Sequence, residues 1–225
     1  MVPVQNTRTN TTMSTSAYLT LTQWFSPGFP VGAFAYSHGL ENAIDEGAIA
    51  DSETLQVWLQ DIISHGSARN DAILLAAAFD AGENTLSHID ATARALAASR
   101  ERLTETLDQG AAFAQTVDEI WATDIGPLCY PVAVGRAARL EGLPLDMTAE
   151  LYVHAFAANL VSAAVRLIPL GQTEGQAVLA ALAPMVRETA RTAIQLGLEN
   201  ISSNCFALDI AAMRHETQYS KVFRT

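Results

Sequence analysis

The sequence predicts an all-α protein, built as a single-domain bundle of about ten short to medium helices. Helical periodicity is clear in residues 51–66, where apolar side chains recur at intervals of three and four. Proline and glycine separate further segments of helical length, and no segment alternates apolar and polar residues as a half-buried strand does. Since no internal repeat or linker divides the chain, we expect one helical domain over residues 17–216.

A stiff, non-helical crossing is expected before the first clear helix. The stretch FSPGFPVGAFAYSHGLE, residues 25–41, contains Pro27 and Pro30, each of which fixes φ and removes a backbone donor. Its glycines can adopt backbone angles that other residues avoid. We expect this loop to be held in a defined shape, with Ser37 capping a helix whose first turns contain Glu41.

Local signals predict the helix over residues 51–66. Asp51 or Ser52 can cap its start, and Glu53 suits the positive end of the helix dipole. The apolar face of this helix is predicted to consist of Leu55, Trp58, Leu59, Ile62, Ile63 and Gly66.

Similar punctuation marks the remaining helices. The predicted segments are 69–81, a polar pattern through 98, 99–123, 131–141, 148–168, 172–198 and 204–216, followed by a tail over 217–225. Ser99 and Thr148 are expected to cap their segments, and Pro184 is expected to restart or kink the path of its own segment. Small side chains on several of these segments predict closely spaced helix axes.

The composition excludes several classes of function. A net charge of −11, from 24 acidic and 13 basic residues, argues against nonspecific binding to nucleic acid or to an anionic membrane. The single lysine, Lys221, lies in neither a phosphate-binding loop nor a pyridoxal-binding context, so we expect no cofactor and no nucleotide hydrolysis by this chain. Only 16% of the residues are charged, which is consistent either with a surface covered by a partner or with a large interior.

The sequence also predicts a soluble, cytoplasmic protein. Residues 1–16 lack the apolar region of a signal peptide and are expected to be a disordered polar lead. Two separated cysteines, Cys129 and Cys205, do not make a disulfide scaffold and favour a reducing compartment. The apolar windows are interrupted or too short to span a bilayer.

The sequence AYSHG, residues 35–39, is one residue away from the G-x-S-x-G motif of serine hydrolases. That motif requires a strand before the serine, and a Pro- and Gly-containing loop precedes Ser37 here. We therefore favour a helix cap at Ser37, with a serine hydrolase as the alternative.

The histidines are scattered, without an HxH or HExxH motif or a cluster with cysteine. They are His38, His65, His88, His154 and His215. We expect no autonomous metal site, although a weak or shared metal contact, for example across a dimer axis, stays open.

Arg166 lies on an apolar helix ahead of a corner formed by Pro169 and Gly171, and Gln172 and Gln176 follow. An arginine among apolar neighbours must pair its guanidinium group or direct it at a groove. Two interpretations remain: Arg166 pins the corner by bonding helix-end carbonyls, or it contacts a partner.

The C-terminal stretch LDIAAMRHETQYSKVFRT combines cationic and aromatic side chains. Arg214, Lys221 and Arg224 account for three of the 13 basic residues of an acidic protein. Tyr219 and Phe223 lie at i and i+4, a spacing that suits an amphipathic turn docking into a partner groove. The alternative is that this tail packs back on its own domain.

Three stretches together resemble the urease accessory protein F family (UreF): SPGFPVGAFAYSHGLENAIDEG (26–47), VSAAVRLIPLGQTEGQ (161–176) and LDIAAMRHETQYSKVFRT (208–225). The resemblance covers the chain beyond its first dozen or so residues. It implies an all-helical accessory protein, without catalytic activity of its own, that acts in maturation of the nickel enzyme urease. Members of the family bind the accessory protein UreD or UreH, dimerise, and recruit the GTPase UreG so that nickel reaches apo-urease, and they are proposed to regulate that GTPase.

The resemblance also implies site residues. In the C-terminal motif, the segment from His215 to Tyr219, followed by Phe223 and Arg224, matches the stretch associated with docking UreD or UreH. Lys221 and Val222 stand where the family pattern has Arg and Leu, and Thr225 stands where it has Ser. The predicted partner-binding residues are Tyr36, Ser37, His38, Glu41, Arg166, Gln172, Gln176, Arg214, His215, Glu216, Tyr219, Lys221, Phe223 and Arg224.

The function expected from this resemblance is that of a scaffold coupling GTP-dependent nickel release to urease activation. An autonomous nickel-binding chaperone is the alternative, and a hydrolase using Ser37 is a further one.

Overall fold

The computed structural model describes residues 15–202 and 204–225, and every regular element in these ranges is helical. The elements are α1 (Thr15–Trp24), η1 (Ala33–Ala35), α2 (Leu40–Asp45), α3 (Ser52–His65), α4 (Ser67–Asp80), α5 (Glu83–Ala95), α6 (Arg100–Trp121), α7 (Tyr130–Leu140), α8 (Leu145–Leu167), α9 (Gln172–Ala193), η2 (Leu198–Asn200) and α10 (Phe206–His215), where η marks a 3₁₀ helix. The prediction of an all-α, single-domain bundle is confirmed.

Most of the predicted polar lead over residues 1–16 lies outside the described residues. Its last two residues, Thr15 and Ser16, form the first turn of α1. This helix buries Leu21 and Trp24, and the Trp24 ring meets the ring of Phe113 edge to face, with the centroids 5.1 Å apart.

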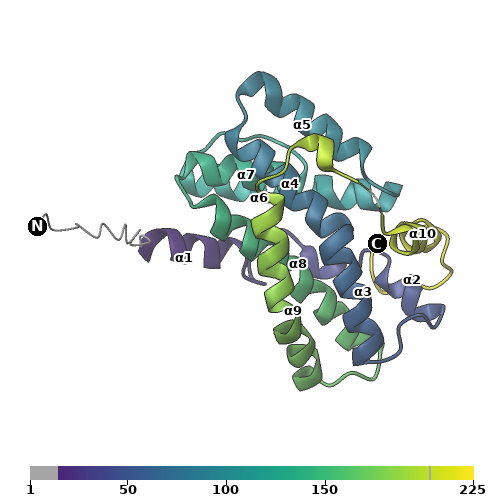
Figure 1. Ribbon diagram of the computed structural model, residues 1–225. Helices are drawn as coiled ribbons and strands as arrows, with labels where there is room; N and C mark the ends of the chain where they lie inside the picture. Colours follow the sequence, from purple (N-terminus) through teal and green to yellow (C-terminus); the bar gives the residue numbers. More distant parts are fainter. Residues whose placement is uncertain (1–14, 203) are drawn as a thin grey trace, which may run out of the picture.

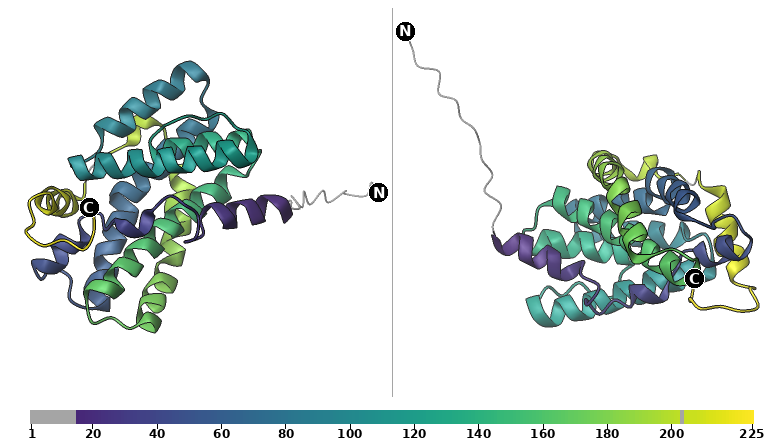
Figure 2. Two further views of the ribbon diagram at one scale, coloured as in Figure 1. Left: turned by 180° about the vertical axis from the view of Figure 1, so that it is seen from behind. Right: turned by 90° about the horizontal axis from the view of Figure 1, so that it is seen from below.

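The helix α4 is the central element of the bundle. It packs against α3, α5, α7, α8 and α9, and α8 and α9 form a further closely packed pair (Figure 1). In both figures, α1 and α10 lie at opposite ends of the molecule (Figure 2). None of the helices in the described ranges has both the length and the apolar character needed to cross a bilayer.

Small residues bring α4 and α7 close together. A Cβ atom at Gly135 of α7 would overlap the carbonyl oxygen of Leu75 on α4. The alanines Ala72 and Ala76 of α4 are also buried. The prediction of closely spaced axes is therefore confirmed for this pair.

Two predicted caps are present. The Asp51 carboxylate accepts the backbone N–H of Thr54 at 2.9 Å, and the Thr54 hydroxyl accepts the N–H of Asp51 at 3.1 Å, which forms a reciprocal capping box for α3. The Ser99 hydroxyl accepts the N–H of Arg102 at 3.1 Å at the start of α6.

Two other predictions are wrong in detail. Thr148 does not cap α8, because the helix already begins at Leu145, and the Thr148 hydroxyl donates instead to the carbonyl of Pro144 at 2.7 Å. Pro184 does not restart its segment, because α9 continues through it to Ala193; a kink at Pro184 stays a prediction. Contacts with α3, α4 and α8 hold α9 in one piece although proline removes a backbone donor.

Candidate functional site

Three stretches that are far apart in the sequence meet beside α2. They are the loop and first turn around residues 34–42, the end of α8 at Arg166, and residues 216–225 after α10, which we call the strap. Figure 2 shows the strap and α2 at the same end of the molecule. We call the place where they meet the three-segment junction.

The carboxylate of Glu41 fixes the strap to α2. It accepts the backbone N–H groups of Val222 at 2.6 Å and of Phe223 at 2.8 Å. Both Glu41 and Phe223 are buried, so the charge-assisted bond between them forms out of contact with water. The Glu41 side chain thus serves the strap rather than the capping of its own helix.

His215, the last residue of α10, joins the same anchor. Its side chain is fully buried, with Nε2 lying 3.2 Å from Glu41 Oε2 and Nδ1 lying 2.6 Å from Oε2 of Glu101 on α6. The second oxygen of Glu101 accepts a bond from Lys221 Nζ at 2.7 Å. The strap is therefore tied to α2 and α6 at once.

Arg166 connects the end of α8 to the other two segments. Its Nη2 atom donates to the carbonyl of Phe34 at 3.1 Å, and its guanidinium carbon lies 4.4 Å from the centroid of the Phe223 ring. The backbone N–H of Arg224 donates to the carbonyl of Ala35 at 2.8 Å. Arg166 thus bonds the carbonyl of Phe34 in the loop before α2, and its Nε also donates to the carbonyl of Ser162 near the end of its own helix at 3.2 Å, so it bonds a helix carbonyl as one interpretation of the sequence expected.

A buried charge cluster lies below the strap. Glu105 of α6 pairs with Arg102 and with His38, whose Nε2 lies 2.7 Å from Oε1, and it also accepts the hydroxyl of Thr225 at 2.9 Å. Burial alone would raise the pKa of Glu105, but the charges of Arg102 and His38 lower it to about 2. Burial, and then the charge of Arg102, lowers the pKa of His38.

The backbone around His38 is strained in a way that the sequence did not indicate. His38 has φ 56°, in the left-handed region that residues other than glycine seldom adopt. Gly39 follows with φ 77°, and a Cβ atom there would lie 2.6 Å from the backbone nitrogen of Ala212 on α10. This close approach and the positive φ account for glycine at position 39, which is the N-cap residue of α2; Ser37, the expected cap, lies two residues upstream.

Ser37 has a structural role in this arrangement. Its hydroxyl donates to the carbonyl oxygen of Thr225 and accepts the N–H of Glu41 at 3.3 Å, so it supports the first turn of α2 from upstream. Ser37 is fully buried, and no histidine is among its partners in the described part of the chain. These contacts do not resemble those of an activated serine nucleophile.

The junction divides the predicted partner-binding residues into two groups. Buried are Tyr36, Ser37, His38, Glu41, His215 and Phe223. Exposed are Arg166, Gln172, Gln176, Arg214, Tyr219, Lys221 and Arg224, while Glu216 is intermediate. The first group sets the shape of the site, and the second group lies at the surface. Gln172 and Gln176 lie on the first turns of α9 and belong to none of the contacts described above.

Sequence reasoning missed the contribution of α6. Besides Glu101 and Glu105, it supplies Asp108, whose carboxylate accepts the Tyr36 hydroxyl at 3.2 Å. Arg224 Nη1 in turn donates to that hydroxyl at 3.4 Å. A signal was present, because the acidic residues of α6 recur at the three- and four-residue spacings of one helix face.

The surface beside the strap exposes several large apolar side chains. Phe206, Ile210 and Met213 lie on one face of α10 and are 69%, 46% and 52% exposed. On the strap, Tyr219 is fully exposed and Val222 is 72% exposed. An apolar face with cationic neighbours is suited to docking another protein.

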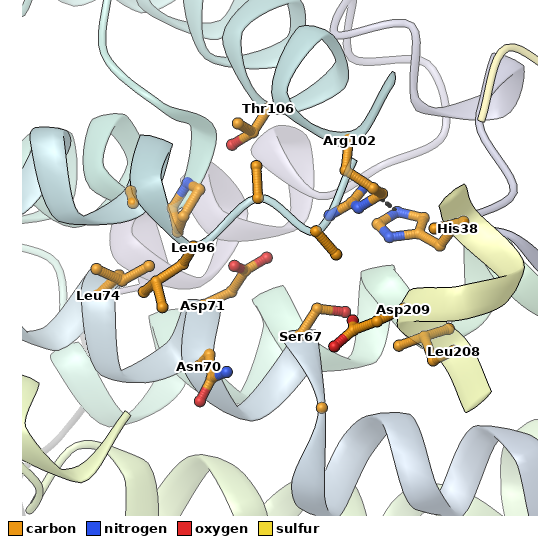
Figure 3. A pocket seen from close by; sticks show the side chains of 16 residues that line it. His38, Ser67, Asn70, Asp71, Leu74, Leu96, Arg102, Thr106, Leu208 and Asp209 are labelled. Carbon is orange, nitrogen blue, oxygen red and sulfur yellow. Dashed lines mark hydrogen bonds between the residues drawn. The ribbon is translucent and has the colours of Figure 1, made fainter. Parts of the chain in front are cut away.

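A small cavity with both apolar and charged lining residues lies behind the charge cluster. Its volume is about 80 Å³, and Asp71, Arg102 and His38 approach it from α4, α6 and the loop before α2 (Figure 3). The Tyr152 hydroxyl donates to Asp71 at 2.9 Å. Among the described residues, no group of three or more histidine, cysteine, aspartate or glutamate side chains is arranged so that it could hold a metal ion.

Comparisons with known proteins agree with this architecture. A family model described as UreF matches residues 49–183. A protein from Roseobacter denitrificans described as urease accessory protein UreF is 68% identical over 213 residues, which cover 95% of this chain and 96% of that protein. Proteins with the same description from Ruegeria pomeroyi and Cereibacter sphaeroides are 51% identical over 208 residues (92% and 96% covered) and 53% identical over 209 residues (93% and 99% covered).

Proposed function

This chain belongs to the UreF family of urease accessory proteins, and from that premise we propose that it is an adaptor in urease maturation whose partner-docking surface is the three-segment junction. In this proposal the chain binds the UreD or UreH accessory protein and recruits the GTPase UreG in the cytoplasm. Nickel is the cargo that the assembly delivers to apo-urease, and the adaptor dimerises within the complex and modulates the GTPase.

The observation that supports the proposal best is the two-sided construction of the strap. Phe223 is buried and its backbone is bonded to Glu41, while Tyr219 and the neighbouring Val222 face outward. The two alternatives for the tail, packing on its own domain and docking to a partner, are therefore compatible. One set of side chains holds the strap, and another set is left for a partner.

This construction favours binding on physical grounds. A segment that is already fixed loses less conformational entropy when a partner docks, so more of the contact energy appears as affinity. Exposed tyrosine and arginine side chains are also the types that most often dominate the energy of a protein interface. Arg224 meets both conditions, because its backbone N–H is bonded to Ala35 while its side chain is 69% exposed, and Tyr219 meets the second.

Co-purification with UreD or UreH, and then with UreG, tests the proposal. We expect Tyr219→Ala and Arg224→Ala each to weaken capture of at least one partner by about tenfold, the effect of losing about 1.4 kcal/mol of binding energy. Removing residues 214–225 should abolish partner capture. Tyr18→Ala is a matched control, because Tyr18 is 51% exposed on α1 at the other end of the molecule. Unchanged complex formation in all three junction variants would overturn the proposal.

A further inference from the structure

Asp71 of α4 and Arg102 of α6 direct opposite charges into the same cavity, whose volume is about 80 Å³ (Figure 3). None of the ion pairs of the described residues joins the two side chains directly. Arg102 uses Nη1 to pair with Glu105 and to contact His38, while its Nε and Nη2 atoms donate to no group in the described part of the chain. Asp71 Oδ2 accepts the Tyr152 hydroxyl, and Oδ1 has no bond among the same contacts. A carboxylate and a guanidinium group thus face a shared space with hydrogen-bonding capacity left over.

Two further polar groups of the cavity wall lack a partner. The atoms are Nδ1 of His38 and Oγ of Ser67, both buried and neither bonded to a group of the described residues. His38 is only 7% exposed, and an unbonded polar atom is costly at a buried position. The Thr106 hydroxyl also lines the cavity, and it accepts the N–H of Tyr130 at 3.2 Å, which leaves its own proton to donate. The wall therefore offers both donors and acceptors to a guest.

We propose that this cavity is a binding site for water, and that bound water joins Asp71 to Arg102 as a water-mediated ion pair. Water fits both groups because it donates to a carboxylate and accepts from a guanidinium group at the same time. A cation would be repelled by Arg102, and an anion would be repelled by Asp71. Cavities that stay empty are lined by apolar side chains, whereas a polar cavity holds water if it offers about 10 to 15 Å³ for each molecule.

The bound water connects α4 to the three-segment junction. Arg102 pairs with Glu105, and Glu105 in turn contacts His38 Nε2 at 2.7 Å and accepts the hydroxyl of Thr225 at 2.9 Å. Water between Asp71 and Arg102 therefore extends this network from the strap to the central helix of the bundle. The inference goes beyond the adaptor function and does not rest on it, because one chain contains the whole site.

Small side chains at and after the end of α5 leave the room for this water. Ala93, Ala97 and Ala98 line the cavity on that side. A larger apolar side chain at one of these positions would occupy the space without touching the charged groups themselves. The cavity can therefore be filled while Asp71 and Arg102 are both kept.

A crystal structure of the full wild-type chain tests the position of the water. We expect one water molecule within about 3.2 Å of both an Asp71 oxygen and an Arg102 nitrogen, or a short chain of water molecules linking the two. Further water should bond His38 Nδ1 or Ser67 Oγ, which would account for the buried atoms that lack a protein partner.

Oxygen-17 magnetic relaxation dispersion tests the same water in solution, because it counts the water molecules that stay bound for longer than the protein takes to tumble. Ala93→Leu fills the cavity and should lower this count by about one water molecule per chain or more. Ala95→Leu is the matched control, since it makes the same change at an exposed position of the same helix and should leave the count unchanged. Cooperative urea unfolding of each variant shows that it is folded.

The water site would be overturned by a crystal structure in which Asp71 bonds Arg102 directly, or in which no water or a different molecule lies between them. A folded Ala93→Leu variant with the wild-type count would overturn it as well. If Ala93→Leu does not fold, the wild-type crystal structure decides alone. None of these results affects the adaptor function, which co-purification tests, and a failure of Tyr219→Ala and Arg224→Ala to weaken partner capture would leave the water site standing.

Discussion

At the residue scale, Asp71 is a carboxyl group whose surroundings oppose its charge. It lines the cavity behind the charge cluster, and the Tyr152 hydroxyl donates to it at 2.9 Å. Burial raises its pKa from the ordinary 3.8 to about 6, while the charge of Arg102 opposes that rise. The folded protein therefore takes up this proton more readily than the unfolded chain does. The stabilisation that follows is complete below about pH 4 and is lost as pH rises through about 6.

The substitution Asp71→Asn tests whether Asp71 lowers the stability of the fold as pH rises. Asparagine keeps an acceptor for the Tyr152 hydroxyl and removes the charge, so the variant should be more stable than the wild type at about pH 8, by about 1 to 2 kcal/mol. At about pH 4 the difference should fall to less than about 0.5 kcal/mol. Urea unfolding at the two pH values measures both numbers.

An exposed residue on the same helix supplies the control. Asp80→Asn, at the end of α4, should change the free energy of unfolding by less than about 0.5 kcal/mol at either pH. If Asp71→Asn instead lowered the free energy of unfolding at pH 8, the prediction would be wrong. Arg102 would then stabilise the Asp71 charge more strongly than burial disfavours it.

At the element scale, the capping signals that were local in sequence were predictable. Asp51 and Ser99 cap their helices because a side-chain oxygen only needs to accept the backbone N–H three residues later, which is a local contact. The start of α8 was missed because Pro144 precedes the helix and leaves Thr148 inside it. The helix α1 was missed because its threonine-rich sequence has weak helical propensity, and packing of Leu21 and Trp24 decides its conformation.

The contact between α4 and α7 should not tolerate an added methyl group. Gly135→Ala would place a Cβ atom against the carbonyl oxygen of Leu75, so the two helices must separate or bend. We expect a loss of about 2 to 4 kcal/mol in the free energy of unfolding, measured by urea titration.

A glycine without such a neighbour shows whether the loss comes from the contact. At Gly28, an added Cβ atom would lie 3.5 Å from the Ser26 hydroxyl, an ordinary contact, and φ is not positive. Gly28→Ala should therefore change stability by less than about 0.5 kcal/mol. Equal effects of the two substitutions would show that backbone entropy, rather than helix spacing, sets the cost.

At the scale of the whole molecule, the junction could not be read from the sequence. The bond between Glu41 and Phe223 joins residues 182 positions apart, and no local pattern encodes it. The three motifs indicated many of the participating residues, but not that His215 and Phe223 face inward while Tyr219 faces outward. That division depends on α6, which brings Glu101 and Glu105 to the strap through helix packing alone.

The strap should detach without unfolding the bundle. Phe223 is the only strap residue in the main hydrophobic core, whose other members lie between α1 and α10. In Phe223→Ala, we expect cleavage by trypsin after Lys221 to accelerate by about tenfold or more, because the strap opens more often. The global free energy of unfolding should fall by no more than about 2 to 3 kcal/mol, and unfolding should stay cooperative.

Val222→Ala, at a neighbouring position that is 72% exposed, should leave both measurements unchanged. If trypsin cleaved the strap of Phe223→Ala only as often as the whole bundle unfolds, the strap and the bundle would be a single cooperative unit, and the separation between a stable core and a releasable docking segment would be lost.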